Sequence, residues 1–260
     1  MKESELWTVT YGEGPLVAVA IHAGHALRPE IAERMRLSEE ARLREEDPYT
    51  SIWTSIAPTR IVVHRSRFEV DLNRPREGAV YVSPEQSWGL EVWKAPLPRD
   101  VIDRSLEIRE RFYAMLRALL EDLRTRHGRF VVYDLHSYNH RRDGPGSPAA
   151  DPSGNPEVNV GTGTMDRGRW SPLIACFMRD MRGFDMDGCA LDVRENVRFK
   201  GGYLSQFVHE EFPEHGCALA VEFKKTFMDE WTGHPDEARI GKLGRALAAT
   251  VPGVLTALHR

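Results

Sequence analysis

Four short runs of mostly apolar residues constrain the fold of this chain more than any other feature of its sequence. They are Leu16–Ile21, Arg60–Val63, Phe130–Leu135 and Ala218–Val221. Because these runs lack the polar alternation of a half-exposed strand, they are typical of strands that are buried on both faces. Strands of this kind occur in parallel sheets that helices cover on both sides.

Longer amphipathic segments lie between these runs. In Arg99–Arg126 apolar residues recur at close to 3.6 positions, which predicts a long helix with one buried face. Further helices are expected at Pro29–Glu46, Ser171–Met181, Tyr203–Phe212 and Asp236–Ala249. Helices that alternate with buried strands predict an α/β fold, with a mostly parallel, doubly wound sheet and helices on both faces.

The chain shows no sign of a division into domains. It has 260 residues, which one large domain accommodates, and it holds no repeat, low-complexity tract or convincing linker. One segment stands apart: residues Asn139–Gly168 are rich in glycine and proline and predict a long irregular loop, a feature that is often functional. We expect a single domain over residues 1–260.

Charge and cysteine usage argue against several classes of protein. The net charge is -4 with acids and bases interspersed, which argues against nucleic acid as the main partner. The first residues show no secretion signal, and no apolar run reaches the roughly 20 residues of a membrane helix. The cysteines Cys176, Cys189 and Cys217 lack CxxC spacing and are expected to be reduced. Together these features favour a cytoplasmic protein without a membrane partner.

Three of the four runs lead directly into side chains that bind metals or move protons. His22 follows the first run, His136 the third and Glu222 the fourth. Because ligands of open α/β sheets bind beyond the carboxyl ends of the strands, we expect these side chains to meet in one crevice. A single histidine at such a place could instead cap the strand. Two histidines with a carboxylate suit a catalytic zinc site, which uses three protein ligands and keeps one position for water.

The third ligand is open between three candidates. Asp47 is favoured because Pro48 breaks the chain there and can aim the aspartate inward. Glu46, its neighbour in an acidic cluster, and His25, which forms an HxxH pair with His22, are the alternatives. The acidic cluster could also be a solvated helix end.

The segment Arg65–Pro75, with the sequence RSRFEVDLNRP, is a candidate substrate-binding element. Arg67 and Arg74 can grip a carboxylate with a planar fork of donors, and Asn73 adds a directed hydrogen bond. An anionic substrate held in this way would present its amide to the metal. The alternative is a surface belt in which Glu69 and Asp71 neutralise the arginines.

A set of motifs in fixed order makes the resemblance to a known family specific. The motifs are His22-Ala-Gly, Glu46-Asp47, SRFEVDLNRP, DLHS at 134–137, KGG at 200–202 and EFKKTFM from Glu222. In this order they resemble the N-formylglutamate amidohydrolase family over roughly residues 15–235, and DLNRP and DLHS are the most specific. That family is related to the zinc exopeptidases, the aspartoacylase-like deacylases and the N-acetylmuramoyl-L-alanine amidases. The chain departs from the usual PHSG of the family, because it reads IHAG at 21–24.

The resemblance implies a zinc-exopeptidase-like (phosphorylase/hydrolase-like) fold and a role for each matching residue. It implies zinc binding by His22, Asp47 and His136. It implies substrate binding by Arg67, Asn73 and Arg74, and catalysis by Glu222 as the general base with Arg67 at the oxyanion. The implied reaction, a step of histidine catabolism, converts the small anionic substrate N-formyl-L-glutamate to formate and L-glutamate. The alternatives are an amidase or peptidase acting on a peptide or cell-wall fragment, and a non-catalytic metal- or ligand-binding protein of the same fold.

Three nearby features carry smaller predictions. Asp134 lies two residues before His136 on the same side of the strand, and we expect it to orient the imidazole or to make a sheet-end hydrogen bond. The loop after His136 is expected to act as a lid over the pocket. Lys200 with the two glycines that follow is expected to form a turn, with an anion contact as the alternative.

Overall fold

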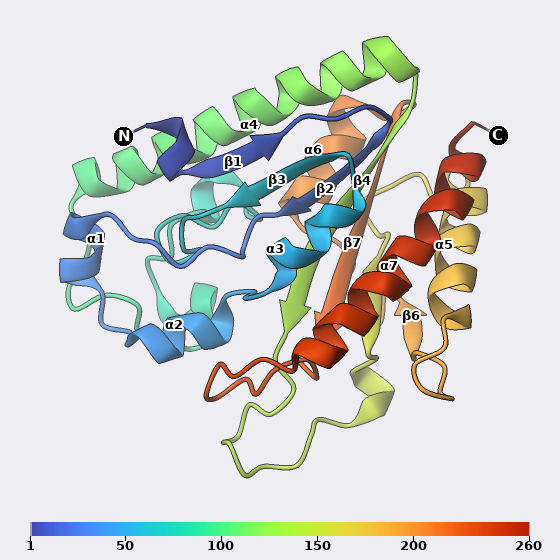
Figure 1. Ribbon diagram of the computed structural model, residues 1–260. Coiled ribbons are helices and arrows are strands. Elements are labelled where there is room, and N and C mark those ends of the chain that lie inside the picture. The colour runs from blue at the N-terminus through green and yellow to red at the C-terminus, as the bar shows by residue number, and fades with distance from the viewer. Residues whose placement is uncertain (1, 260) are drawn as a thin grey trace.

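The computed structural model describes residues 2–259 and is built around one seven-stranded sheet, with the strand order β1-β3-β2-β4-β7-β5-β6 (Figure 1). The strands are β1 (Trp7–Thr10), β2 (Leu16–Ala20), β3 (Thr59–Val63), β4 (Phe130–Tyr138), β5 (Val158–Gly161), β6 (Val193–Glu195) and β7 (Gly216–Lys224). The four strands expected from the apolar runs form the contiguous centre of the sheet, β3-β2-β4-β7.

The sheet is mixed, and its centre is parallel. The pairings of β2 with β3, β2 with β4, β4 with β7 and β5 with β6 are parallel. The antiparallel pairings are those of β1 with β3 and β5 with β7. The expectation of a mostly parallel sheet in an α/β fold is therefore confirmed, with one antiparallel junction on each side of the parallel centre.

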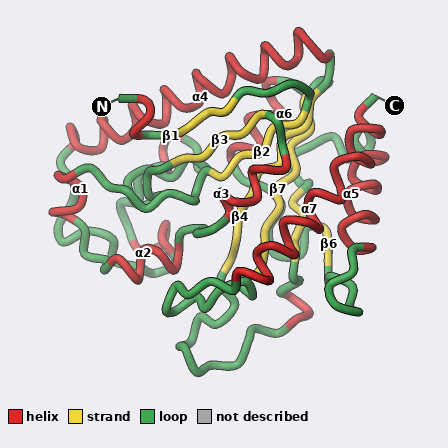
Figure 2. Tube along the Cα trace, in the orientation of Figure 1, coloured by secondary structure: helices red, strands yellow, loops and turns green. Residues whose placement is uncertain are grey.

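Helices cover both faces of the sheet, as expected for a doubly wound fold (Figures 1 and 2). The α-helices are α1 (Pro29–Arg34), α2 (Glu39–Glu45), α3 (Thr50–Trp53), α4 (Arg99–His127), α5 (Ser171–Gly183), α6 (Tyr203–Glu211) and α7 (Glu237–Leu258). Short 3-10 turns lie at Glu3–Glu5, Thr54–Ile56, Arg76–Gly78, Pro84–Ser87 and Pro152–Gly154. Helices α4 and α6 lie on one face of the sheet, and α3, α5 and α7 lie on the other (Figure 1).

Alternate side chains of three central strands, β2, β4 and β7, supply two separate cores. In β7, Leu219 and Val221 pack into the layer that contains Phe177 of α5, whereas Ala218 packs into the layer that contains Phe112 of α4. All five of these side chains are buried. A strand that is buried on both faces has no polar alternation, which explains the uninterrupted apolar runs.

Several predicted boundaries were wrong, each for a local reason. The single helix expected at Pro29–Glu46 is two helices, because Ser38 caps α2 by accepting a hydrogen bond from the backbone N–H of Ala41. The irregular loop expected at Asn139–Gly168 contains strand β5, whose four residues are too few to leave a clear pattern. Helix α7 continues past its predicted end at Ala249 and contains Pro252.

Among the residues that the structure describes, no helix combines the length and the apolar character needed to span a lipid bilayer.

Candidate metal centre and active site

The candidate site lies where the central parallel strands end. His22 follows β2 by two residues, whereas His136 lies within β4 and Glu222 within β7. The expectation that both residues come after their strands was wrong, because β4 and β7 extend three residues beyond the predicted apolar runs. His136 and Glu222 are direct partners in the parallel register of β4 and β7, so their strands hold them side by side.

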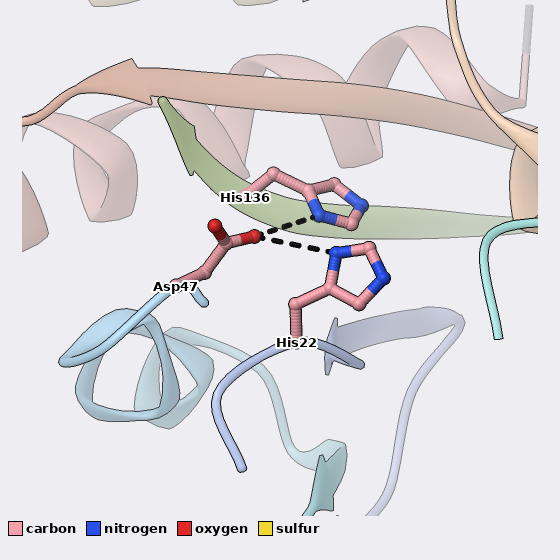
Figure 3. Close-up of side chains that lie close together, drawn as sticks. All are labelled: His22, Asp47 and His136. Atoms are coloured by element: carbon pink, nitrogen blue, oxygen red, sulfur yellow. Dashed lines mark hydrogen bonds and ion pairs between the residues drawn. The ribbon is translucent and has the colours of Figure 1, made fainter. Parts of the chain in front are cut away.

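Three side chains meet at this edge of the sheet in an arrangement that could hold a metal ion. One ligand atom each from His22, Asp47 and His136 lies within 4.8 Å of the others (Figure 3). Oδ2 of Asp47 lies 3.4 Å from Nδ1 of His22 and 3.1 Å from Nδ1 of His136. All three residues are buried. The inward-facing donors are therefore two imidazole nitrogens and one carboxylate oxygen.

Each histidine turns its other nitrogen toward a second buried carboxylate. Nε2 of His22 donates to Oδ1 of Asp71 at 2.7 Å. Nε2 of His136 lies 2.8 Å from Oδ1 of Asp134, at ion-pair distance. A proton held on Nε2 by these carboxylates would leave the lone pair of Nδ1 available to a metal ion between the imidazoles and Asp47, as in the carboxylate–histidine–metal arrangements of zinc sites. The donor set therefore fits zinc, which prefers neutral imidazole and carboxylate ligands.

The electrostatics of the cluster also favour a cation. Burial lowers the pKa of His136, but the carboxylates of Asp134 and Glu222 outweigh it and hold the pKa well above its usual value. Burial raises the pKa of Asp47, but hydrogen bonds from the two imidazoles outweigh it and hold the pKa below its usual range. The pKa of His136 rises because buried carboxylates surround it, and the pKa of Asp47 falls because two imidazoles contact it. A divalent cation between these groups would neutralise the same negative charge.

The two alternative ligands pair with each other instead. Nδ1 of His25 lies 2.5 Å from Oε2 of Glu46, and Arg42 contacts both side chains. Ser66 also donates to Glu46. The structure thus brings Asp47 to the two histidines, whereas Glu46 and His25 form a neighbouring network of their own.

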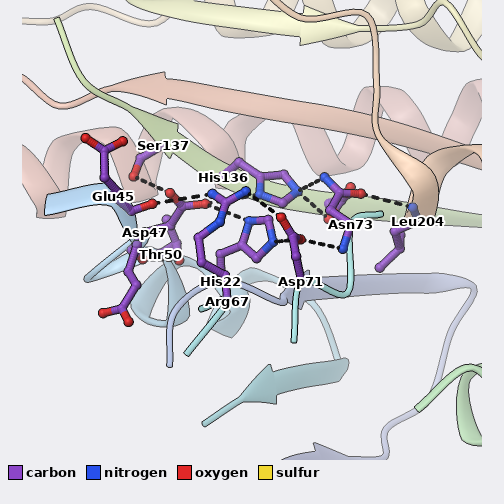
Figure 4. A network of polar contacts seen from close by, with 12 residues as sticks. His22, Glu45, Asp47, Thr50, Arg67, Asp71, Asn73, His136, Ser137 and Leu204 are labelled. Atoms are coloured by element: carbon purple, nitrogen blue, oxygen red, sulfur yellow. Dashed lines mark hydrogen bonds and ion pairs between the residues drawn. The ribbon is translucent and has the colours of Figure 1, made fainter. Parts of the chain in front are cut away.

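Arg67 lies at the centre of a polar network beside the cluster (Figure 4). Its Nη2 donates to Oδ2 of Asp71 at 2.9 Å, and its Nη1 donates to the carbonyl of Glu45 at 3.4 Å. Its guanidinium carbon also lies 4.7 Å from the ring centroid of Trp88. Asp71 therefore neutralises the charge of Arg67, as expected if the segment were a surface belt of ion pairs. Arg67 nevertheless lines the candidate pocket. Glu69 pairs with Arg28 at 2.7 Å and with Arg65 of the same segment at 3.8 Å.

Asn73 and Arg74 lie next to this network. Nδ2 of Asn73 approaches Nε2 of His136 at 3.4 Å, and its Oδ1 accepts from the backbone N–H of Leu204 at 3.0 Å (Figure 4). A Cβ atom at Gly202 would lie 2.3 Å from the side chain of Asn73, so only glycine admits this contact. Arg74 lies 3.7 Å from Asp71 and lines the pocket.

These side chains surround a cavity of about 340 Å³. His22, Asp47, His136 and Glu222 lie in its wall, together with a group of cationic side chains: Arg67, Arg74, Arg142, Arg198, Lys200 and Lys225. Such a lining is complementary to an anionic ligand. The Lys200–Gly202 segment borders the cavity. The two predictions for this segment, a turn and a contact with an anion, are therefore compatible with each other.

Several residues of this wall were not predicted. Arg142 and Arg198 stand in segments without a recognisable motif, and only the fold brings them to the cavity. Lys225 lies within the EFKKTFM motif, but the sequence assigned it no role. Asp71 was considered only as a partner of the arginines, and its bond to His22 could not be read from spacing. The start of the glycine- and proline-rich segment does border the cavity, through Asn139 and Arg142. Its role as a lid stays a prediction.

Glu222 has the environment of a general base. Burial, with the carboxylates of Asp47 and Asp134, raises the pKa of Glu222 to about 7, against an opposing effect of His136. A base whose pKa lies near the working pH exchanges protons most effectively.

Comparisons with known proteins show the family and the fold of this chain. A sequence model of the N-formylglutamate amidohydrolase family matches residues 14–228. The crystal structure of N-formylglutamate amidohydrolase from Ralstonia eutropha JMP134 is similar with a TM-score of 0.74 and 19% identity, over 98% of each chain. That of gene product Atu2144 from Agrobacterium tumefaciens is similar with a TM-score of 0.66 and 16% identity, over 97% of this chain and 98% of that one. At these sequence identities, the similarity to the two structures shows the fold alone.

Among curated protein sequences, no relative matches this chain. The family model, however, covers most of the chain and includes every residue of the candidate site. The chain belongs to the N-formylglutamate amidohydrolase family.

Proposed function

We propose that this chain is a single-domain, zinc-dependent amidohydrolase that converts N-formyl-L-glutamate and water to formate and L-glutamate. Membership of the family supports amide hydrolysis as the class of reaction. The proposal adds the metal, the substrate and the role of each residue.

In this proposal His22, Asp47 and His136 hold the zinc ion. When bound, zinc supplies Lewis acidity, which lowers the pKa of water and polarises a carbonyl group. Asp71 and Asp134 keep the two imidazoles in the tautomer that presents Nδ1 to the metal, as their distances of 2.7 and 2.8 Å from the outer nitrogens allow. Ser137, whose Oγ donates to Oδ1 of Asp47 at 3.3 Å, helps to orient the carboxylate.

Glu222 is the proposed general base. It takes a proton from the attacking water molecule and returns it to the amide nitrogen as the carbon–nitrogen bond breaks. Its place beside His136 in the strand register supports this role, because the base must lie next to the metal. Arg67 donates to the carbonyl oxygen as negative charge develops there, which contributes about 3 kcal/mol in comparable sites.

Arg74 and Asn73 are proposed to bind a carboxylate of the substrate, together with Arg67. A planar guanidinium forms paired hydrogen bonds with a carboxylate, and Arg74 keeps more than a third of its side chain exposed to receive one. The surplus of cationic side chains in the cavity wall supports an anionic N-acyl amino acid as the substrate class.

One observation carries the proposal: Glu222 and the His22–Asp47–His136 cluster line the same cavity, with Glu222 paired to His136 across two strands. A binding protein has no need of a carboxylate with a raised pKa beside its metal.

The test is formate release from N-formyl-L-glutamate by the zinc-loaded protein and by Glu222→Gln. We expect the substitution to lower kcat by about 100- to 10,000-fold, because it removes the base, while the zinc content stays at one per chain. A panel of other N-acyl amino acids and of cell-wall peptides identifies the preferred substrate. No turnover of N-formyl-L-glutamate by the fully loaded wild-type protein would contradict the proposed substrate.

A further inference from the structure

Lys225 is a buried lysine at the edge of the cavity to which the proposed reaction assigns no step of its own. It lies directly after β7, three residues beyond Glu222, and its side chain is almost fully buried, with 1% relative exposure. Its backbone N–H donates to the carbonyl of Tyr138 at 3.0 Å, so it continues the pairing of β7 with β4. A buried ammonium group is costly unless its donors are satisfied, which calls for a specific reason for its presence.

The ammonium group bonds to the backbone that leads into Asp47. Nζ of Lys225 donates to the carbonyl of Arg44 at 2.5 Å and to the carbonyl of Glu46 at 2.7 Å. These carbonyls lie at the end of α2, where the last carbonyls of a helix lack partners within the helix. Lys225 therefore supplies two hydrogen bonds that the helix itself cannot make.

The sequence explains why an outside donor is needed here. The carbonyl of Arg44 would normally accept from the N–H four residues later, but that residue is Pro48, which has no N–H. The equivalent donor for Glu46 is the N–H of Thr50, which points instead to the carbonyl of Asp47 at 3.4 Å. The break that aims Asp47 inward thus leaves both carbonyls open to Lys225.

The backbone N–H and carbonyl of Asp47 also form hydrogen bonds that hold the residue in place. Its backbone N–H donates to the carbonyl of His22 at 2.9 Å, and its carbonyl accepts from Oγ1 of Thr50 at 2.7 Å. Lys225 holds the residue immediately before it. A backbone hydrogen bond therefore links the proposed ligands His22 and Asp47. The side chain of Lys225 links Glu46, the residue before Asp47, to the end of β7, the strand that carries Glu222.

We propose that Lys225 is a positioning residue that fixes Asp47 for metal binding by clamping the carbonyls of Arg44 and Glu46. This inference rests on the proposed function, because it assumes that Asp47 is a metal ligand. Groups that orient metal ligands typically change metal affinity 10- to 100-fold when they are removed.

The test compares Lys225→Met with Lys225→Arg and with Lys224→Met. Methionine keeps most of the unbranched apolar chain and removes the donors, whereas arginine keeps a cation with several N–H donors. Lys224 is the matched control, because its Nζ donates at 2.8 Å to the carbonyl of Asn155 and it is not among the residues described as lining the cavity. Zinc affinity is measured by competition with a chromophoric chelator, and kcat and KM are measured with N-formyl-L-glutamate over a range of free zinc.

We expect Lys225→Met to weaken zinc binding about 10- to 100-fold. The zinc concentration for half-maximal activity should shift by the same factor, while KM at saturating zinc changes little. Lys225→Arg should restore zinc affinity to within a few fold of wild type, and Lys224→Met should match wild type. Because zinc also stabilises any folded chain that binds it, rescue by excess zinc supports the proposal only when the zinc-free variant is folded.

Wild-type zinc affinity in Lys225→Met, or an equal loss in Lys224→Met, would overturn the proposal. If Lys225→Met does not fold, Lys225→Gln, which keeps a single donor group, is measured instead. A several-fold loss of zinc affinity in that variant supports the proposal, and wild-type affinity overturns it. Absence of zinc binding by the wild-type protein would instead contradict the proposed function, so the two failures are distinguishable.

Discussion

The outer nitrogens of the two proposed histidine ligands depend on buried carboxylates. Asp134 is fully buried, and among the described residues no group donates a well-aligned hydrogen bond to its oxygens, so the imidazole of His136 is what offsets its charge. The pair is therefore interdependent: Asp134 needs a positive or proton-bearing partner, and His136 needs an acceptor on Nε2.

Removing that charge should weaken the metal site. We expect Asp134→Asn to reduce zinc affinity about 10- to 100-fold, because the amide keeps the shape of the side chain but holds the imidazole less strongly. The control is Tyr133→Phe, since Tyr133 faces the opposite layer and bonds to Thr250 at 2.8 Å. Chelator competition measures both variants, and equal zinc affinity in Asp134→Asn and wild type would contradict this role.

The pH dependence of activity should follow the ionisation of Glu222. Burial raises the pKa of Glu222 to about 7, and a general base works only in its deprotonated form. Activity should therefore be low at acidic pH and rise as pH increases through the pKa of Glu222. A bound cation stabilises the carboxylate, so the rise in kcat/KM should be centred at or below pH 7. A profile of kcat/KM that stays flat between pH 4 and pH 8 would argue against Glu222 as the base.

At the scale of elements, the start of α6 and the segment that carries Asn73 depend on each other. The carbonyl of Asn73 accepts from the N–H of Tyr203 at 3.2 Å, and its Oδ1 accepts from that of Leu204. Gly202, the residue before α6, packs directly against the side chain of Asn73. The helix therefore positions a proposed substrate-binding residue.

A methyl group at this contact should disturb substrate binding. Gly202→Ala would place Cβ 2.3 Å from Asn73, and relief of such crowding costs about 1–3 kcal/mol. We expect KM for N-formyl-L-glutamate to rise about tenfold or more, with a smaller change in zinc affinity. Gly183→Ala at the end of α5 is the control, because a Cβ there has nothing within 4 Å. An unchanged KM in Gly202→Ala would show that Asn73 does not contact the substrate.

Strands and helices with strong patterns were predictable from the sequence, and short elements were not. The four central strands have runs of mostly apolar residues and α4 has a long helical repeat of apolar residues, so the pattern of buried residues alone predicts them. Strands β1, β5 and β6 have three or four residues each, and their identity depends on pairing with neighbours that the sequence does not show. The break between α1 and α2 had a signal in Ser38, a residue that favours the start of a helix.

The candidate site was predictable in part for the same reason. Residues at the ends of buried strands could be placed, because parallel strands end at a common edge. Asp47 was favoured over Glu46 because of the break at Pro48, but the threonine and the distant lysine that hold this break could not be predicted from the sequence. Cationic residues such as Arg142 and Arg198 reach the cavity through long loops, whose paths only the whole fold determines.

At the scale of the whole molecule, the site draws on segments that span most of the chain. His22 and Glu222 lie 200 residues apart in sequence, and the parallel order β2-β4-β7 brings their strands within one strand of each other. The two cores on either side of the sheet hold this order, since β2, β4 and β7 each contribute to both. Catalysis is therefore expected to depend on the integrity of the entire sheet rather than on one segment.

The most direct test of the central claim is a crystal structure of the zinc-loaded protein, with the metal located by its anomalous scattering. We predict one zinc ion bound by Nδ1 of His22, Nδ1 of His136 and a carboxylate oxygen of Asp47, at about 2.0–2.2 Å. Glu222 should face the open coordination position. An ion bound elsewhere, or one that lacks either histidine, would contradict the account.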